Sequence, residues 1–176
     1  MIRIRAHHLF CTLLYEGRGY SGAFNTQMAE TAGALKDALK CAQEDVLKDV
    51  PAGAQEGEVT VCLLDSPDEI CGACPKRSFD GLRCAADGRS AALPDAAVRM
   101  DRALLAGLHL HAGQSYTYRE LIRIAADGLT HPLYDEVCGT CSWSRKGVCC
   151  FERLQERLND GVAGGLRTAD AHTAGK

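Results

Sequence analysis

The alternation of apolar and polar residues predicts two short strands and several helices. Residues 2–5 alternate apolar and charged side chains with the period of a strand. Residues 59–64 predict a second strand, and their mixture of apolar side chains on both faces suggests burial on both sides. A continuous apolar stretch over residues 7–15 predicts a helix that ends before Gly17 and Gly19.

Four further helices follow from periodicity and capping signals. Ser21 is the N-cap expected for a helix that runs to about Cys41. Another helix should start near Asp95, and the sequence T-Y-R-E from Thr117 is a capping box for the next. A last helix should start after Cys150. The apolar positions expected to face the interior are Phe24, Met28, Leu35, Leu39, Val98, Leu104, Leu105, Leu108, Phe151, Leu154 and Leu158.

These elements predict an α+β fold that is predominantly helical, with several short helices, a small two-stranded sheet and cysteine-rich metal loops that staple the chain. We expect residues 1–158 to form a single metal-binding domain. Residues 159–176 are rich in Gly, Ala and Thr and lose periodicity, so we expect a flexible C-terminal tail. Residues 50–57, rich in Pro, Gly and Ala, should form a loop.

Composition and charge narrow the classes of partner. Hydrophobic residues make up 46% of the 176 residues, enough for a packed core. The net charge is −3 and the Lys and Arg residues are scattered, which argues against a nucleic-acid surface. No segment approaches the roughly 18 apolar residues of a membrane span, and the N-terminus has no signal cleavage site. We therefore expect a cytoplasmic protein that does not bind membranes and whose partner is an unidentified redox or other protein.

The ten cysteines are the strongest chemical signal in the chain. In a reducing compartment, closely spaced cysteines indicate metal or redox chemistry rather than disulfides. Two triplets resemble each other. Cys71, Cys74 and Cys84 lie in CGACPKRSFDGLRC, and Cys138, Cys141 and Cys149 lie in CGTCSWSRKGVCC. A C-x-x-C turn places two sulfurs on one side, where both reach one ion or cluster. We expect the glycine of each C-G-x-C to adopt a backbone conformation that a side chain would resist.

The remaining cysteines divide differently. Cys41 and Cys62 are isolated within a predicted helix and a predicted strand, so we expect them to be core residues. Cys149 and Cys150 are adjacent, and adjacent side chains rarely bind one ion. Cys149 matches the G-x-C pattern better and is the expected ligand.

Each triplet lacks a fourth ligand, and the N-terminal helix offers candidates. At about 100° per residue, His7 and Cys11 lie about 40° apart, and His8 and Cys11 about 60° apart. All three could face the triplets. Two arrangements remain open: two sites that each take one N-terminal ligand, or one cluster held by four of the six triplet cysteines. The four other histidines have no ligand spacing: His109, His111, His131 and His172.

At these residues the chain resembles the bacterial and archaeal domain-of-unknown-function family numbered 1284. The resemblance rests on R-x-H-H-L-x-C at residues 5–11, G-Y-S at 19–21, D-S-P-D-E-I-C-G-A-C-P at 65–75, T-Y-R-E-L at 117–121, and C-x-x-C-x-W followed by G-x-C over 138–149. It covers about residues 1–158. Ser142 and Gly22 depart from the family pattern, and residues 42–57 form a longer connection than the family has. The resemblance implies an iron–sulfur cluster and no particular activity.

Three functions remain open. The first is an iron–sulfur protein that acts in electron transfer or redox sensing. The second is a zinc-stapled module that recognises a protein or nucleic acid, because thiolates suit zinc and clusters alike. The third is an enzyme that uses His7 or His8 as a base or metal ligand. The nearby carboxylates Asp68 and Glu69 have no distinctive spacing, and turn carboxylates are usually solvated. We do not expect an enzyme on its own.

Overall fold

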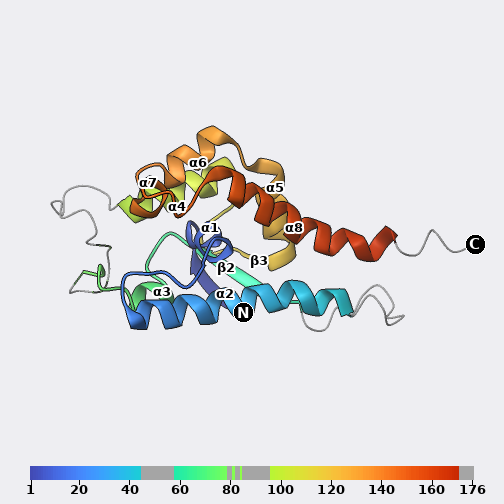
Figure 1. The fold of residues 1–176 in the computed structure, drawn as a ribbon, viewed down its shortest axis with the longest axis horizontal. Coiled ribbons are helices and arrows are strands. Elements are labelled where there is room, and N and C mark those ends of the chain that lie inside the picture. The colour runs from blue at the N-terminus through green and yellow to red at the C-terminus, as the bar shows by residue number, and fades with distance from the viewer. Residues whose placement is uncertain (45–57, 79–80, 82–83, 85–95, 171–176) are drawn as a thin grey trace, which may run out of the picture.

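The computed structural model describes residues 1–44, 58–78, 81, 84 and 96–170, and for residues 40–44 and 164–170 it describes the backbone alone. The described chain is mostly helical with one small mixed sheet, which confirms the predicted fold class. In Figure 1 the sheet and the short helix α1 lie between α2 on one side and α4, α6 and α8 on the other. Residues 50–57, which we predicted to form a loop, lie outside the described residues. None of the described helices is both long and apolar enough to span a membrane.

The sheet has three strands in the order β1-β2-β3, one more than predicted. β1 (Ile2–Arg5) pairs in parallel with β2 (Thr60–Leu64), with Arg5 opposite Leu64. β3 (Ser115–Thr117) pairs antiparallel with β2. Three residues are too few to produce a recognisable period of two, so β3 escaped the sequence pattern. The predicted burial of β2 on both faces is confirmed, because Val61, Cys62 and Leu63 are all buried.

The parallel pairing of β1 and β2 determines where the functional residues meet. The carboxyl ends of parallel strands share one edge of a sheet, which is where α/β proteins commonly bind ligands. Here β1 leads directly into α1 (His8–Leu13), and β2 leads within a few residues into α3 (Glu69–Gly72). Two segments about sixty positions apart, residues 5–11 and 65–74, therefore begin side by side.

The longer helices surround this edge. α2 (Gly22–Glu44) starts as predicted after Ser21, whose hydroxyl accepts a hydrogen bond from the Phe24 amide at 3.1 Å. α5 (Tyr118–Gly128) has the predicted capping box of Thr117 and Glu120. The others are α4 (Ala96–Gly107), α6 (His131–Cys138), α7 (Ser142–Arg145) and α8 (Phe151–Asp170). α3, α6 and α7 are short and were not predicted separately.

One core joins the sheet to the helices. The largest of its fully buried hydrophobic side chains come from β1, α1, α2, β2, α3, α4, α5 and α8: Ile4, Leu9, Phe10, Leu35, Leu63, Ile70, Leu104, Leu121, Ile122, Leu154 and Leu158. The last helix continues to Asp170, so the helical backbone extends into the segment after residue 158 that we assigned to a tail. The flexibility of that tail stays a prediction.

Candidate metal centre

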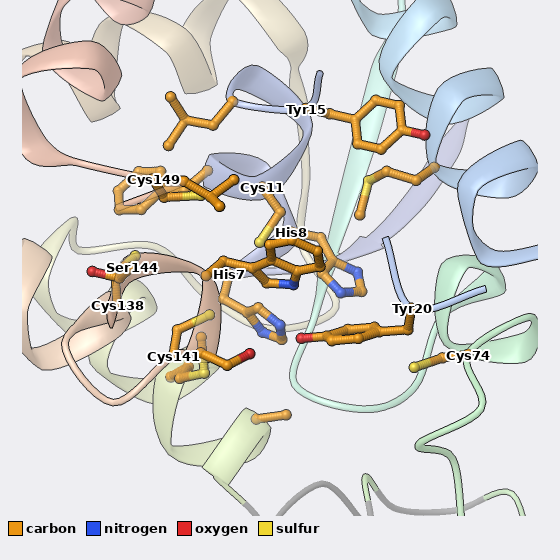
Figure 2. Close-up of a pocket in the computed structure, with 18 of the residues that line it drawn as sticks. His7, His8, Cys11, Tyr15, Tyr20, Cys74, Cys138, Cys141, Ser144 and Cys149 are labelled. Carbon is orange, nitrogen blue, oxygen red and sulfur yellow. The ribbon is translucent and has the colours of Figure 1, made fainter. Parts of the chain in front are cut away.

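The start of the chain brings its three candidate ligands to one cavity. His7 is the N-cap residue of α1, and the helix begins at His8. His7, His8 and Cys11 all line a cavity of about 230 Å³ (Figure 2). The three residues therefore reach one cavity, as their helical spacing allowed, whereas metal binding by these residues stays a prediction.

The second cysteine triplet lines the same cavity. Cys138 is the last residue of α6, Cys141 is the N-cap residue of α7, and Cys149 shortly precedes α8. The Cys141 amide donates a hydrogen bond to the Cys138 carbonyl at 2.9 Å, which closes the expected C-x-x-C turn. Helix ends and turns thus hold these thiols, although the three cysteines span twelve positions of the chain.

Cys11 joins this triplet from the opposite end of the sequence. Burial raises the pKa of Cys11 well above its usual value, and the neighbouring thiolates of Cys141, Cys138 and Cys149 raise it further. Burial likewise raises the pKa of Cys138 to about 12 and that of Cys149 to about 11, again with contributions from the neighbouring thiolates. We refer to Cys11, Cys138, Cys141 and Cys149 as the four-cysteine wall. A metal cation is the charge that would stabilise these four groups as thiolates.

The first triplet lines a different side of this cavity. Cys71 lies in α3, and the Cys74 amide donates to the Cys71 carbonyl at 3.1 Å. Cys84 pairs with Arg77 in an isolated β-bridge and also lines the cavity. Figure 2 shows Cys74 beyond the Tyr20 ring, on the far side of the cavity from Cys138 and Cys141. The structure therefore brings both triplets to one cavity without merging them.

The two sides differ in how closely their ligand atoms approach. One ligand atom from each of His8, Asp68 and Cys71 lies within 4.8 Å of the other two, and we call this group the mixed wall. Over the part of the chain that the structure describes, no other three His, Cys, Asp or Glu residues form so compact a group. No three thiols of the four-cysteine wall are therefore within that distance of one another.

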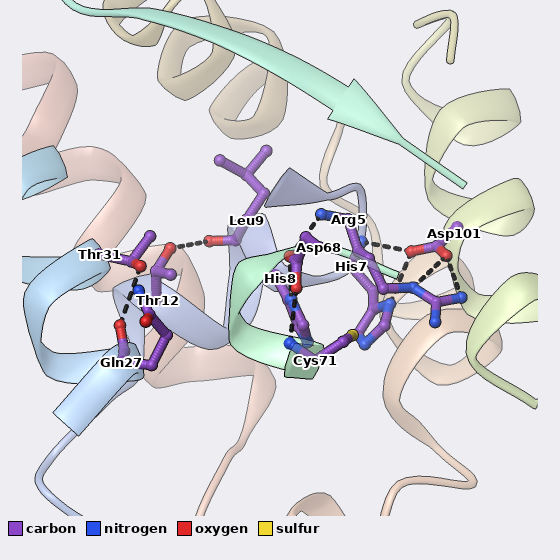
Figure 3. Close-up of polar contacts among 10 residues, drawn as sticks. All are labelled: Arg5, His7, His8, Leu9, Thr12, Gln27, Thr31, Asp68, Cys71 and Asp101. Atoms are coloured by element: carbon purple, nitrogen blue, oxygen red, sulfur yellow. Dashed lines mark hydrogen bonds and ion pairs between the residues drawn. The ribbon is translucent and has the colours of Figure 1, made fainter. Parts of the chain in front are cut away.

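Asp68 organises the mixed wall, as Figure 3 shows. Its carboxylate accepts hydrogen bonds from the Arg5 amide at 2.8 Å and the Cys71 amide at 2.9 Å, and lies 2.6 Å from Nδ1 of His8. Burial alone would raise the pKa of Asp68, but the His8 ring and the two amides hold it well below its usual value. The expectation that Asp68 is solvated was wrong, because its side chain is fully buried.

A second buried carboxylate holds the neighbouring histidine. Asp101 of α4 accepts from the Arg5 Nε at 2.8 Å and from the His7 amide at 3.0 Å, and lies 2.6 Å from Nδ1 of His7. Burial would raise the pKa of Asp101, but the hydrogen bonds and charges of His7 and Arg5 lower it. Burial lowers the pKa of His7, which favours its neutral ring. A neutral ring that donates from Nδ1 leaves a lone pair on Nε2.

The sequence interpretation missed Arg5 and Asp101 as members of this network. Both side chains are fully buried. A usable signal existed for Asp101, because it lies on the helical face shared by the apolar residues Leu104, Leu105 and Leu108. A lone carboxylate on the buried face of a helix requires a partner, and that requirement could have marked it.

Cys71, His8 and Asp68 contain the residue types of a nucleophilic triad, but their electrostatics disfavour that reading. A nucleophilic cysteine needs a lowered pKa. Burial raises the pKa of Cys71 to about 12, and the negative charge of Asp68 contributes to the rise. The thiol therefore keeps its proton near neutral pH unless a cation displaces it. These donors suit a metal better than a covalent intermediate.

The glycines of the two C-G-x-C turns differ. A Cβ at Gly139 would lie 2.4 Å from the Asp135 carbonyl oxygen, so the backbone there resists a side chain, as expected. A Cβ at Gly72 would meet nothing closer than 3.9 Å, and Gly72 has no positive φ, so the expectation was wrong for that glycine. The positive φ angles belong to the later glycines, Gly81 at +71° and Gly147 at +68°, each shortly before the third cysteine of its loop.

Tyr20 connects the two cysteine loops beside the cavity. Its ring centroid lies 5.4 Å from that of Trp143 in the second loop, and the Lys76 Nζ of the first loop lies 4.3 Å from the ring centroid. Phe24 packs on it at 5.1 Å. Burial raises the pKa of the Tyr20 hydroxyl. The Tyr20 ring therefore contacts both loops and lies between their two sets of cysteines on one side of the cavity.

The remaining cysteines and histidines whose side chains the structure describes do not line this cavity. Cys62 is buried in β2, as predicted, and the side chain of Cys41 lies outside the described residues. Cys149 lines the cavity and Cys150 does not, and the choice of Cys149 as the ligand stays a prediction. His131 stacks on Phe151 at 3.6 Å. The nine cysteines with described side chains are free thiols.

Comparison with known proteins yields one match. The family described as "Protein of unknown function (DUF1284)" matches residues 19–147. This range contains five of the six triplet cysteines and excludes Cys149 and the segment at residues 5–11. No curated protein and no solved structure matches the chain.

Proposed function

The chain belongs to the DUF1284 family of proteins of unknown function, and from that premise we propose that it binds an iron–sulfur cluster and acts in electron transfer or redox sensing. The ligands are the four-cysteine wall: Cys11, Cys138, Cys141 and Cys149. One observation carries the proposal, namely that Cys11 meets the second triplet in one cavity. Four thiolates are the usual ligand set of [2Fe–2S] and [4Fe–4S] clusters.

The spread of the four thiols supports a cluster over a single ion. Tetrahedral zinc with bonds of about 2.3 Å requires its sulfur ligands to lie about 3.8 Å apart. Across the described residues, no three of these thiols lie within 4.8 Å of one another. In a cluster the thiolates bind different irons, so they stand further apart.

The surroundings of the wall suit a redox centre. Cys138 is 8% exposed, and the other three thiols are partly buried beside apolar residues such as Leu14 and Val148. Burial and hydrogen bonding tune the potential of a cluster. The cluster would take up or release one electron, which a separate redox partner would supply or accept.

The test is to purify the protein anaerobically and measure iron, acid-labile sulfide and visible absorbance. We expect stoichiometric iron and sulfide and an absorbance that dithionite bleaches. Cys11→Ser and Cys141→Ser should each lose most of the iron. Cys62→Ser is the matched control, because that buried thiol lies in β2 away from the cavity, and it should keep its iron.

A zinc-stapled recognition module is the second candidate. The observation in its favour is that the four cysteines join α1 to the segment from α6 to α8, as a structural zinc site joins distant segments. Colourless protein with one zinc per four-cysteine wall, unfolding when a chelator is added, would establish this function and refute the cluster.

A further inference from the structure

The two cavity histidines each present one nitrogen that the protein leaves unused. Nδ1 of His8 lies 2.6 Å from Asp68, and Nδ1 of His7 lies 2.6 Å from Asp101. Both residues are only 7% exposed, and their ring centroids are 4.5 Å apart. Neither Nε2 has a hydrogen-bond partner among the described residues. Histidines that bind metals have this arrangement, with the second ring nitrogen held by a carboxylate.

The two histidines differ in their access to sulfur. His8 belongs to the compact group with Cys71, and His7 does not. Asp68 already accepts from two backbone amides and contacts His8, so its oxygens serve to orient the ring and the start of α3 rather than to bind an ion. The two other groups of the mixed wall are the second nitrogen of the His8 ring, Nε2, and the Cys71 Sγ, which also interacts with the Arg5 and Asp68 side chains.

We propose that His8 Nε2 and Cys71 Sγ are two ligands of a mononuclear site for a zinc-class divalent metal ion, separate from the four-cysteine wall. Mixed imidazole and thiolate donors suit such borderline-soft ions. Cys74 follows Cys71 in a C-x-x-C turn and lines the same cavity, which makes it the next thiol of the loop available to this ion. Asp68 is the positioning residue that orients His8.

The site does not depend on the identity of the metal at the four-cysteine wall. Its donors come from the first residue of α1 and from α3, whereas three of the four cysteines come from the segment from α6 to α8. Figure 2 shows Cys74 on the far side of the cavity from Cys138, with His8 between them. An ion here would keep coordination positions directed at the cavity, as metal sites that bind small molecules do.

The experiment titrates Co²⁺, a coloured substitute for Zn²⁺, into anaerobic protein with Cys11→Ser and Cys141→Ser, which disable the four-cysteine wall. We expect one cobalt per chain, with a charge-transfer band from thiolate to metal. Adding Cys71→Ser should abolish that band, and adding His8→Ala should weaken binding at least tenfold. Asp68→Asn should weaken binding about 10- to 100-fold. His111→Ala, an exposed histidine away from the cavity, is the matched control and should bind as its parent does.

The same titration on cluster-loaded wild-type protein provides a second measurement, which requires no substitution in the four-cysteine wall. Cobalt should again bind once without displacing iron, and His8→Gln, which keeps most of the side-chain volume, should weaken it. Cobalt binding unchanged by Cys71→Ser and His8→Gln would overturn the proposal. Loss of cobalt binding in the folded Cys11→Ser, Cys141→Ser protein would also overturn the proposal. Cobalt and the four-cysteine wall's metal would then share one site. Zinc bound at the four-cysteine wall would refute the proposed iron–sulfur cluster and would leave the proposed second site standing.

Discussion

The two walls of the cavity come from loops of similar sequence and differ in chemistry. Both loops read C-G-x-C, then a glycine, then a third cysteine, and both use that later glycine at a positive φ. The second loop meets Cys11 and becomes an all-sulfur wall. The first loop meets His8 and Asp68 and becomes a mixed wall of nitrogen, oxygen and sulfur. Two similar motifs therefore acquire different ligand sets, because different side chains pack against each loop.

The N-terminal helix makes this difference. His8 and Cys11 are one helical turn apart on α1, and each faces a different cysteine loop. Buried thiols with raised pKa values dominate one wall, while a buried carboxylate with a lowered pKa organises the other. The first wall suits a cluster of soft ligands, and the second suits a single borderline ion.

The largest effect should come from the carboxylate that serves neither wall directly. Asp101→Asn removes the charge that balances the fully buried Arg5, so the free energy of unfolding of metal-free protein should fall by about 3–5 kcal/mol. Denaturant unfolding measures this. Asp127→Asn, at an exposed position of α5, is the control. A loss no larger than that of the control would show that the Arg5–Asp101 pair does not hold α4 against the two walls.

Substitutions at the two C-G-x-C glycines should change stability by an intermediate amount, and the change should differ between the two loops. Gly139→Ala places a Cβ 2.4 Å from the Asp135 carbonyl oxygen, so it should cost about 1–3 kcal/mol of stability and lower the iron content. Gly72→Ala meets nothing closer than the Arg77 Nη1 at 3.9 Å and should be nearly neutral. Denaturant unfolding and iron analysis of both variants make the comparison. Equal costs would mean that the loops are held alike.

The smallest expected effect, counted for each thiol and pH unit, is the dependence of stability on pH. Burial raises the pKa values of Cys11, Cys138, Cys149 and Cys71, so the folded metal-free protein holds these protons more tightly than the unfolded chain. Stability is therefore full below the unfolded thiol pKa of about 8.5 and declines as the pH rises above it, by up to about 1.4 kcal/mol per thiol and pH unit.

Thermal unfolding between roughly pH 7 and pH 10, with reductant present, measures this decline. Cys138→Ala should make it shallower, because one of the tightly held protons is removed. A melting temperature that rises over the same range would contradict the assignment of these thiols as buried and protonated.

Much of the fold could be predicted because its signals are local. The alternation in β1 and β2 and the caps at Ser21 and Thr117 each occupy a few consecutive residues. The strand β3 and the short helices α3, α6 and α7 could not be separated, since three to eight residues provide too little period. The end of α8 was misjudged because its glycines and alanines weaken the apolar pattern while the backbone remains helical.

The sequence by itself determined the family, the helical character and the two cysteine triplets, and it placed His7, His8 and Cys11 on one short helical segment, because each depends on residues that are close together in the chain. Only the tertiary structure decided which triplet each N-terminal residue meets, and that Asp68 and Asp101 hold the two histidines. Those contacts depend on the parallel pairing of β1 with β2 and on the packing of α4 and the segment from α6 to α8 around α1. Packing between segments 60 to 140 positions apart leaves no local period in the sequence. The cysteine spacing therefore predicted metal ligands, and the fold divided them into two different walls.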